Sequence, residues 1–117
     1  MRVKGGLAAK KRHKKFLSLA KGFRAGRRTL YRSAREGVER GLSFAYRDRK
    51  VRKREMRSLW IIRLGAAAKT LGLSYSRLIN LLKKSKVEID RRALSDLATL
   101  EPENFATLVK TIQANPA

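Results

Sequence analysis

Apolar residues recur at regular intervals only in the second half of the chain. The clearest series is Met56, Trp60, Leu64, Ala67 and Leu71. Its steps of three and four residues place the series on one face of an α-helix, so Trp60 is expected in a core rather than on the surface. Gly72 predicts the end of this helix, because glycine readily takes the left-handed conformation that follows a helix C-terminus.

Two shorter helices are predicted next, each preceded by a residue that can cap its start. Ser74 precedes a helix over residues 75–84, and Asp90 precedes one over residues 91–99. Between them, residues 87–89 alternate apolar and charged side chains, which indicates a short extended link.

A last helix is predicted over residues 102–113. Pro102 suits its first turn, and Asn115 and Pro116 are expected to end it. No strand pattern and no repeat of fixed period is visible, so the folded part should be a bundle of short helices. The residues expected to face inward are Leu78, Ile79, Leu81, Leu82, Leu94, Leu97, Ala98, Phe105, Leu108, Val109 and Ile112.

Charge dominates the first half of the chain. Eleven of its first thirty residues are Lys or Arg and none is acidic, so this half is expected to bury no core of its own and to order where its charge is neutralised. A helix is predicted over residues 8–20, with Gly22 as its stop. A second helix should begin near Ala25 and run far, since no proline occurs before Pro102.

The expected fold class is therefore all-α, in two parts of different charge. Residues 1–57 carry 21 Lys/Arg against 4 acids and should form a long basic helical N-terminal extension. Residues 58–117 carry 9 Lys/Arg against 5 acids and should form a small globular bundle of short helices. The two parts are expected to do different physical jobs.

The net charge of +21 on 117 residues calls for a polyanionic partner, because so large a charge repels itself in a compact monomer. Nucleic acid is the first candidate and an anionic membrane surface the second. No apolar stretch approaches the roughly 20 residues of a membrane span, and the Lys/Arg-rich start has no apolar segment typical of a secretory signal. The absence of cysteine excludes disulfides and thiol chemistry.

Residues that could carry out catalysis lack partners. His13 stands among lysines and an arginine, which would repel a metal ion, so it is interpreted as a helix-surface residue near a phosphate or a base. Glu101 and Glu103 flank Pro102, where acids favour a helix start. Gly5-Gly6 is too short for a phosphate-binding loop. We therefore expect no catalytic residue, no metal site, no cofactor and no small-molecule substrate.

Three basic clusters in the first half are candidate RNA contacts. Guanidinium groups suit phosphate oxygens because they donate two hydrogen bonds in one plane, and spacings of three and four would give a helix an arginine face. The clusters are Lys10, Lys11, Arg12, His13, Lys14 and Lys15; Lys21, Arg24, Arg27, Arg28, Arg32 and Arg35; and Arg47, Arg49, Lys50, Arg52, Lys53, Arg54 and Arg57. The third, if helical, has charge on every face.

Aromatic residues are interleaved with these charges. Tyr31 and Tyr46 are equally consistent with stacking on unpaired bases and with packing on a neighbouring helix, whereas packing is favoured for Phe44. In the second half, Lys83, Lys84 and Lys86 lie one short link before Arg91 and Arg92, and the two groups are expected to form one further contact patch. The dipole of a helix C-terminus accounts for the lysines alone.

The sequence also resembles the family of bacterial large-subunit ribosomal protein twenty. The similarity covers nearly the whole chain in order, without a large insertion. It rests on Arg12-His13-Lys14-Lys15, Leu19 through Arg24, Tyr46 through Lys50, Lys53-Arg54, Ser58 through Ile61, Gly72 through Ser76, Lys83-Lys84 and Ile89-Asp90-Arg91. Ser74, Tyr75 and Ser76 join the candidate RNA contacts with this match.

The resemblance implies a structural constituent of the large ribosomal subunit rather than an enzyme. Members have a helical extension threaded through the large-subunit RNA and a small helical domain; they bind domain II of that RNA early in assembly. It also implies ribosomal protein twenty-one as a neighbour and, in some bacteria, repression of the protein's own messenger RNA. The expected location is the ribosome of the bacterial cytoplasm, with an organellar ribosome as the alternative.

Three positions depart from the family pattern: Gly65 stands where Asn is expected, Leu81 where Gly is expected, and the order Arg24-Ala25-Gly26 differs. Other classes of protein share the charge. A DNA-architectural protein would more often show a dimer interface or a wedge residue, and a membrane-surface helix would need a broad apolar face, which residues 1–57 lack. A removable organelle leader has little room, since the matching motifs begin by Arg12.

Overall fold

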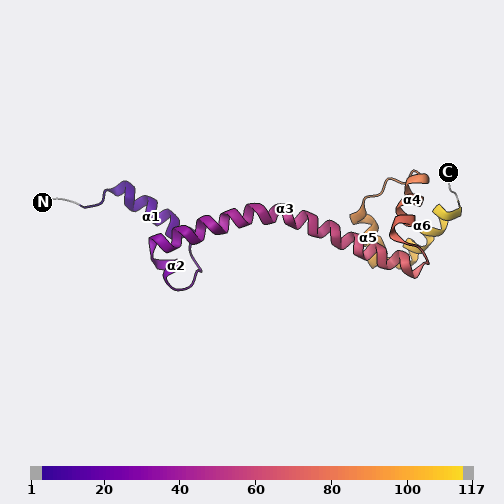
Figure 1. Ribbon diagram of the computed structural model, residues 1–117, viewed down its shortest axis with the longest axis horizontal. Coiled ribbons are helices and arrows are strands. Elements are labelled where there is room, and N and C mark those ends of the chain that lie inside the picture. Colours follow the sequence, from indigo (N-terminus) through magenta and orange to yellow (C-terminus); the bar gives the residue numbers. More distant parts are fainter. Residues whose placement is uncertain (1–3, 115–117) are drawn as a thin grey trace. The chain divides into compact units, whose positions relative to one another are not determined.

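The computed structural model describes residues 4–114, and every regular element in that range is an α-helix (Figure 1), as predicted. In chain order these are α1 (Leu7–Leu19), α2 (Gly26–Thr29), α3 (Tyr31–Thr70), α4 (Tyr75–Lys84), α5 (Arg91–Leu100) and α6 (Pro102–Ala114). The chain forms two compact units, one ending at Lys50 and the other beginning at Val51, so α3 contributes to both. The expected stop at Asn115 and Pro116 lies outside the described residues.

The first unit has a small hydrophobic core, contrary to expectation. The end of α1 packs against the first turns of α3, where Ala20, Ala34 and Val38 are buried. Phe16, Leu17 and Phe23 cover this cluster in part. The prediction that the first half buries no core was wrong, because alanines on both sides let the two helices approach closely with few large apolar residues.

The long helix begins six residues later than Ala25, where the sequence placed its start. Ala25 has φ 53° and ψ −143°, and Leu30 is extended at φ −88° and ψ 119°. These two residues bracket the single turn of α2, and α3 follows directly at Tyr31. The path from α1 to α3 thus passes through non-helical residues on both sides of α2, which the absence of proline could not reveal.

The second unit has the larger core, formed by the predicted side chains. Leu64 and Ala68 of α3 are buried together with Leu78, Leu82, Leu94, Phe105, Val109 and Ile112, and α6 packs against both α4 and α5. Of the apolar series that begins at Met56, only the residues from Leu64 onwards belong to this core. Met56 is exposed, and Trp60 is half-buried outside the core, so the expected core position of Trp60 was wrong. The reason is that the short helices pack only against the last turns of α3.

The predicted starts of α4, α5 and α6 are confirmed, and their predicted ends agree with the structure to within one residue. The Ser74 hydroxyl accepts a hydrogen bond from the amide of Arg77 at 3.3 Å, and the Asp90 carboxylate accepts one from Ala93 at 2.7 Å. Gly72 has φ 74°, and the Leu73 amide donates to the Ala68 carbonyl at 2.9 Å. The left-handed conformation of Gly72, together with this hydrogen bond from Leu73 to the carbonyl five residues earlier, ends α3.

Two of the departures from the family pattern concern the second unit. Leu81 is half-buried and packs against its core, where it adds apolar contact. Gly65 lies where α3 meets the start of α4: a Cβ atom there would be 4.0 Å from Cβ of Tyr75, an ordinary van der Waals contact. Neither departure therefore strains the fold.

We predict that Ala25→Gly stabilises the protein. The φ and ψ of Ala25 fall in a region that costs a side chain about 1–3 kcal/mol and glycine little. The variant should unfold at a higher temperature, measured by circular dichroism. Ala45→Gly is the control, because the same change at this exposed helical position should lower the unfolding temperature. A decrease with both variants would show that Ala25 is not strained.

Candidate nucleic-acid interface

The α1 cluster presents its lysines and Arg12 to solvent, but not His13. Lys10, Lys11, Arg12, Lys14 and Lys15 are exposed. His13 is half-buried, and its ring lies 3.9 Å from that of Tyr31, centroid to centroid. Tyr31 also meets Phe16 edge to face at 6.1 Å. In the protein alone, His13 and Tyr31 therefore pack α1 against α3.

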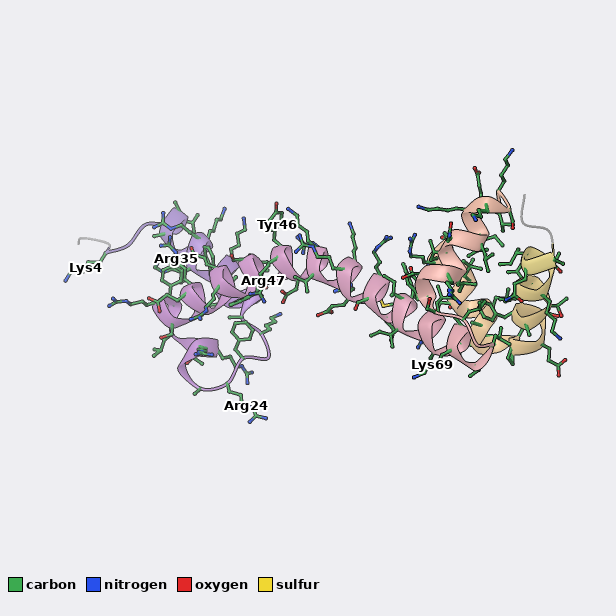
Figure 2. The ribbon with its side chains drawn as sticks, turned by 45° about the vertical axis from the view of Figure 1, so that its right-hand side comes forward. Lys4, Arg24, Arg35, Tyr46, Arg47 and Lys69 are labelled. Carbon is green, nitrogen blue, oxygen red and sulfur yellow. The ribbon has the colours of Figure 1, made fainter. Side chains whose placement is uncertain are left out.

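The second cluster is exposed but does not form one helix face. Lys21 and Arg24 lie between helices, Arg27 and Arg28 lie on α2, and Arg32 and Arg35 lie on α3. The break at Leu30 separates these groups, so the expected continuous arginine face was wrong. Figure 2 shows Arg24 on the loop that follows α1.

Arg35 is the one member of this cluster with a carboxylate partner in the described chain. Its Nε donates to Glu39 at 2.7 Å, and its guanidinium lies 5.9 Å from the Phe16 ring centroid. The hydrogen bond and the negative charge of Glu39, with a smaller effect of Tyr31, raise the pKa of Arg35 above its usual value. The pair of Arg35 with Glu39 is exposed and weak.

The third cluster lies on a stretch of α3 that the chain itself leaves uncovered. Every residue from Glu39 to Lys50 and from Arg52 to Leu59 is exposed. Two acids of this stretch form exposed ion pairs in the described chain: Glu39 with Arg35 at 2.7 Å, and Asp48 with Arg47 at 2.8 Å. Within this stretch, residues 47–55 contain one apolar residue, Val51, so they gain little from tertiary packing and no other part of the described chain covers them.

Two aromatic residues stand on this exposed stretch. Phe44 is 41% exposed, and the guanidinium carbons of Arg47 and Arg40 lie 4.6 and 5.7 Å from its centroid. Its expected packing on a neighbouring helix was wrong, because its ring contacts are arginines of its own helix. Tyr46 is 59% exposed and projects outward from α3 (Figure 2), and Lys50 donates to its hydroxyl at 2.6 Å. Both rings are exposed, with cations of their own helix lying over them.

Sequence reasoning missed a groove in the first unit. It has a volume of about 920 Å³ and lies between the segment that follows α1 and one face of α3. Phe23, Arg24 and Arg27 line one side, and Arg40, Gly41 and Phe44 line the other. The signal in the sequence was Gly37 and Gly41 four residues apart, which leaves one helix face without side chains.

One hydrogen bond places a basic residue of the second unit. Arg91 Nε donates to the Tyr75 hydroxyl at 3.0 Å, so Arg91 joins the start of α4, next to Ser74 and Ser76. Lys83 and Lys84 are exposed in the last turn of α4, about 12 Å further along its axis. Arg91 thus lies beside Tyr75 of the Ser74–Ser76 motif, and its expected patch with the lysines stays a prediction. Arg92 is exposed.

Other chemistry finds little support in the structure. Across residues 4–114 no group of three or more His, Asp or Glu could hold a metal ion. No helix in the same range is long and apolar enough to cross a membrane. Glu101 accepts a hydrogen bond from Asn104 at the start of α6, in keeping with the helix-start role expected for it. The groups that this surface offers to a partner are cations and exposed aromatic rings.

Fold and surface together define a class: small all-helical proteins with a strongly cationic helical half, of the kind found in ribonucleoprotein particles. The chain belongs to the ribosomal protein L20 family. The model of that family, described as Ribosomal protein L20, matches residues 2–108. It is therefore a structural, non-enzymatic component of the large subunit of bacterial-type ribosomes.

Close relatives agree with this assignment. The chain is 56% identical over 110 residues to the large ribosomal subunit protein bL20 of Nitratidesulfovibrio vulgaris (strain DP4), covering 94% of each chain. The bL20 of Oleidesulfovibrio alaskensis is 54% identical over 114 residues, 97% of each chain. That of Geobacter sulfurreducens is 55% identical over 112 residues, 93% of this chain and 96% of its own.

We predict that Tyr75→Phe destabilises the second unit modestly. The change removes the acceptor of the part-buried bond from Arg91, and such a bond contributes about 1 kcal/mol to the free energy of unfolding. Urea denaturation measures the loss. Tyr46→Phe is the matched control, since it removes a hydroxyl whose bond to Lys50 is exposed and should change the free energy of unfolding little. Equal losses would mean that the bond from Arg91 contributes nothing specific to the free energy of unfolding.

Proposed function

We propose that the chain binds large-subunit ribosomal RNA directly and is needed for early assembly of the subunit. The observation that carries this proposal is the stretch of α3 on which every residue from Arg52 to Leu59 is exposed, with charge on all faces. RNA phosphates on several sides would neutralise such a helix and release their counterions, a source of affinity that does not depend on sequence.

Within this function, the proposed division of labour follows the charge. Residues 1–57 act as a cationic helical extension, and residues 58–117 act as a small domain that recognises the shape of an RNA junction. The RNA contacts of the extension are the three basic clusters. Those of the domain are Ser74, Tyr75, Ser76, Lys83, Lys84, Arg91 and Arg92, and the bond between Tyr75 and Arg91 supports grouping part of this set.

The resemblance to the family supports three finer proposals. The RNA site lies in domain II of the large-subunit RNA, ribosomal protein twenty-one is a neighbour, and the protein represses translation of its own messenger RNA. The last requires that the messenger present a structure like the ribosomal site. All three follow from the family and not from any contact in the structure.

Specific binding is tested first by a salt titration with a domain II fragment, random duplex RNA and duplex DNA of equal length. Affinity for all three should fall steeply with salt, and the ribosomal fragment should be preferred by about a hundredfold, or about 2.7 kcal/mol. Equal affinity for all three would leave a non-specific polycation. A preference for duplex DNA would favour an architectural DNA-binding protein.

A pair of charge-matched variants tests where the RNA lies. Arg49→Gln, Arg52→Gln and Arg54→Gln together remove three exposed charges from the uncovered part of α3. If each meets a phosphate, the slope of log affinity against log salt should become shallower by roughly one unit per residue. The control combines Arg63→Gln, Lys69→Gln and Lys110→Gln, three exposed cations outside the proposed contacts. Equal changes in slope would show that only net charge matters.

A further inference from the structure

The groove of the first unit has the size of a site for a single nucleotide. Its volume of about 920 Å³ falls in the range of roughly 300–1,000 Å³ that is usual for pockets enclosing a small ligand. An RNA duplex is far too wide to enter such a space, whereas an unpaired nucleotide can swing out of a loop or a bulge into it.

The charges of the groove favour a phosphate. Arg24, Arg27 and Arg40 line it against the single acid Glu36. In the described part of the chain, the side chains of Arg24 and Arg27 form neither an ion pair nor a hydrogen bond, so their donors are free for a ligand. The strained Ala25 lies between these two arginines, and such strain is typical of binding sites.

The two aromatic residues of the groove have different roles. Phe23 is half-buried, packs against the core of the first unit and forms a wall. Phe44 is the more exposed ring, with Arg40 and Arg47 beside it. A base that lies on Phe44 would extend this stack of arginine and aromatic groups, since every base has a flat face that stacks on an aromatic side chain.

Gly41 leaves the helix side of the groove open. A Cβ atom built at Gly41 meets no other atom within 4 Å, whereas one at Gly37 would be 3.4 Å from the Phe23 ring. The space above Gly41 is therefore empty of protein, and a ligand can reach the α3 backbone there. A Cβ atom at this position causes no clash, and a larger side chain would project into the groove.

We propose that this groove holds one unpaired nucleotide of the ribosomal RNA, with its base on the Phe44 ring and its phosphate between Arg24, Arg27 and Arg40. The proposal rests on direct RNA binding and adds a base-stacking contact within the first unit to the phosphate contacts of the basic clusters. It also explains why a glycine, which disfavours a helix, stands at position 41: a side chain there would project into the nucleotide site.

Gly41→Leu in the full-length chain tests the proposal. The variant should be at least as stable to heat as the wild type, because leucine favours a helix and a Cβ atom at this position meets no other atom within 4 Å. Its affinity for the domain II fragment should fall by about tenfold, the usual order for the loss of one stacked base. Ser43→Leu is the matched control, since it adds the same side chain at an exposed α3 position outside the groove, and its affinity should equal that of the wild type.

A spectroscopic variant separates stacking from simple blocking of the surface. With Phe44→Trp, the indole emission should be quenched on addition of the domain II fragment, while the wild type, with Trp60 alone, sets the background. Phe44→Ala should lose affinity, and Phe44→Trp should retain it.

The outcomes distinguish this proposal from the function on which it rests. Tight wild-type binding, with Gly41→Leu binding equally well and Phe44→Trp unquenched, would overturn the nucleotide site and leave RNA binding intact. Failure of the wild type to prefer the ribosomal fragment would overturn both. Quenching by an acidic peptide but not by RNA would assign the groove to a protein segment instead.

Discussion

Electrostatic repulsion within the chain is the constraint on which the rest of the structure depends. A net charge of +21 opposes any compact arrangement, and most of it is concentrated in residues 1–57. The fold limits the repulsion by keeping the cations on the outside of helices and by leaving the middle of α3 without a neighbour in the chain. Two exposed ion pairs are too weak to offset a charge of this size.

Apolar packing is accordingly confined to two small cores. One lies where α1 meets the first turns of α3, and the other lies where α4, α5 and α6 meet its last turns. The first relies on alanines and on the rings of Phe16, His13 and Tyr31, while the second relies on leucines and on Phe105. Each core holds part of α3 in place, and the proposed RNA partner would cover the residues between, most of which are exposed.

Membership of the ribosomal protein L20 family gives that partner a physical context. In a ribosomal subunit, RNA surrounds proteins with phosphate on several sides, which is the environment that a helix charged on every face requires. The groove beside Phe44 would add contacts of another kind, since a stacked base contributes energy that salt screens little. The cationic surface would provide affinity for the RNA, and the site for an unpaired base would fix where on the RNA the protein binds.

The sequence by itself determined the helical class, the boundaries of α4 to α6 and the core of the second unit. These features depend on local signals: capping by Ser74 and Asp90, the left-handed Gly72, and a regular apolar spacing. It also identified the basic clusters, because charge can be counted without coordinates. Only the tertiary structure decided what those residues meet. No local pattern revealed the break at Leu30. Three further features bring together residues that are distant in the sequence: the packing of His13 on Tyr31, the bond between Arg91 and Tyr75, and the groove over Gly41. Trp60 shows the same limit, since helical spacing says which face a residue occupies but not whether another helix covers that face.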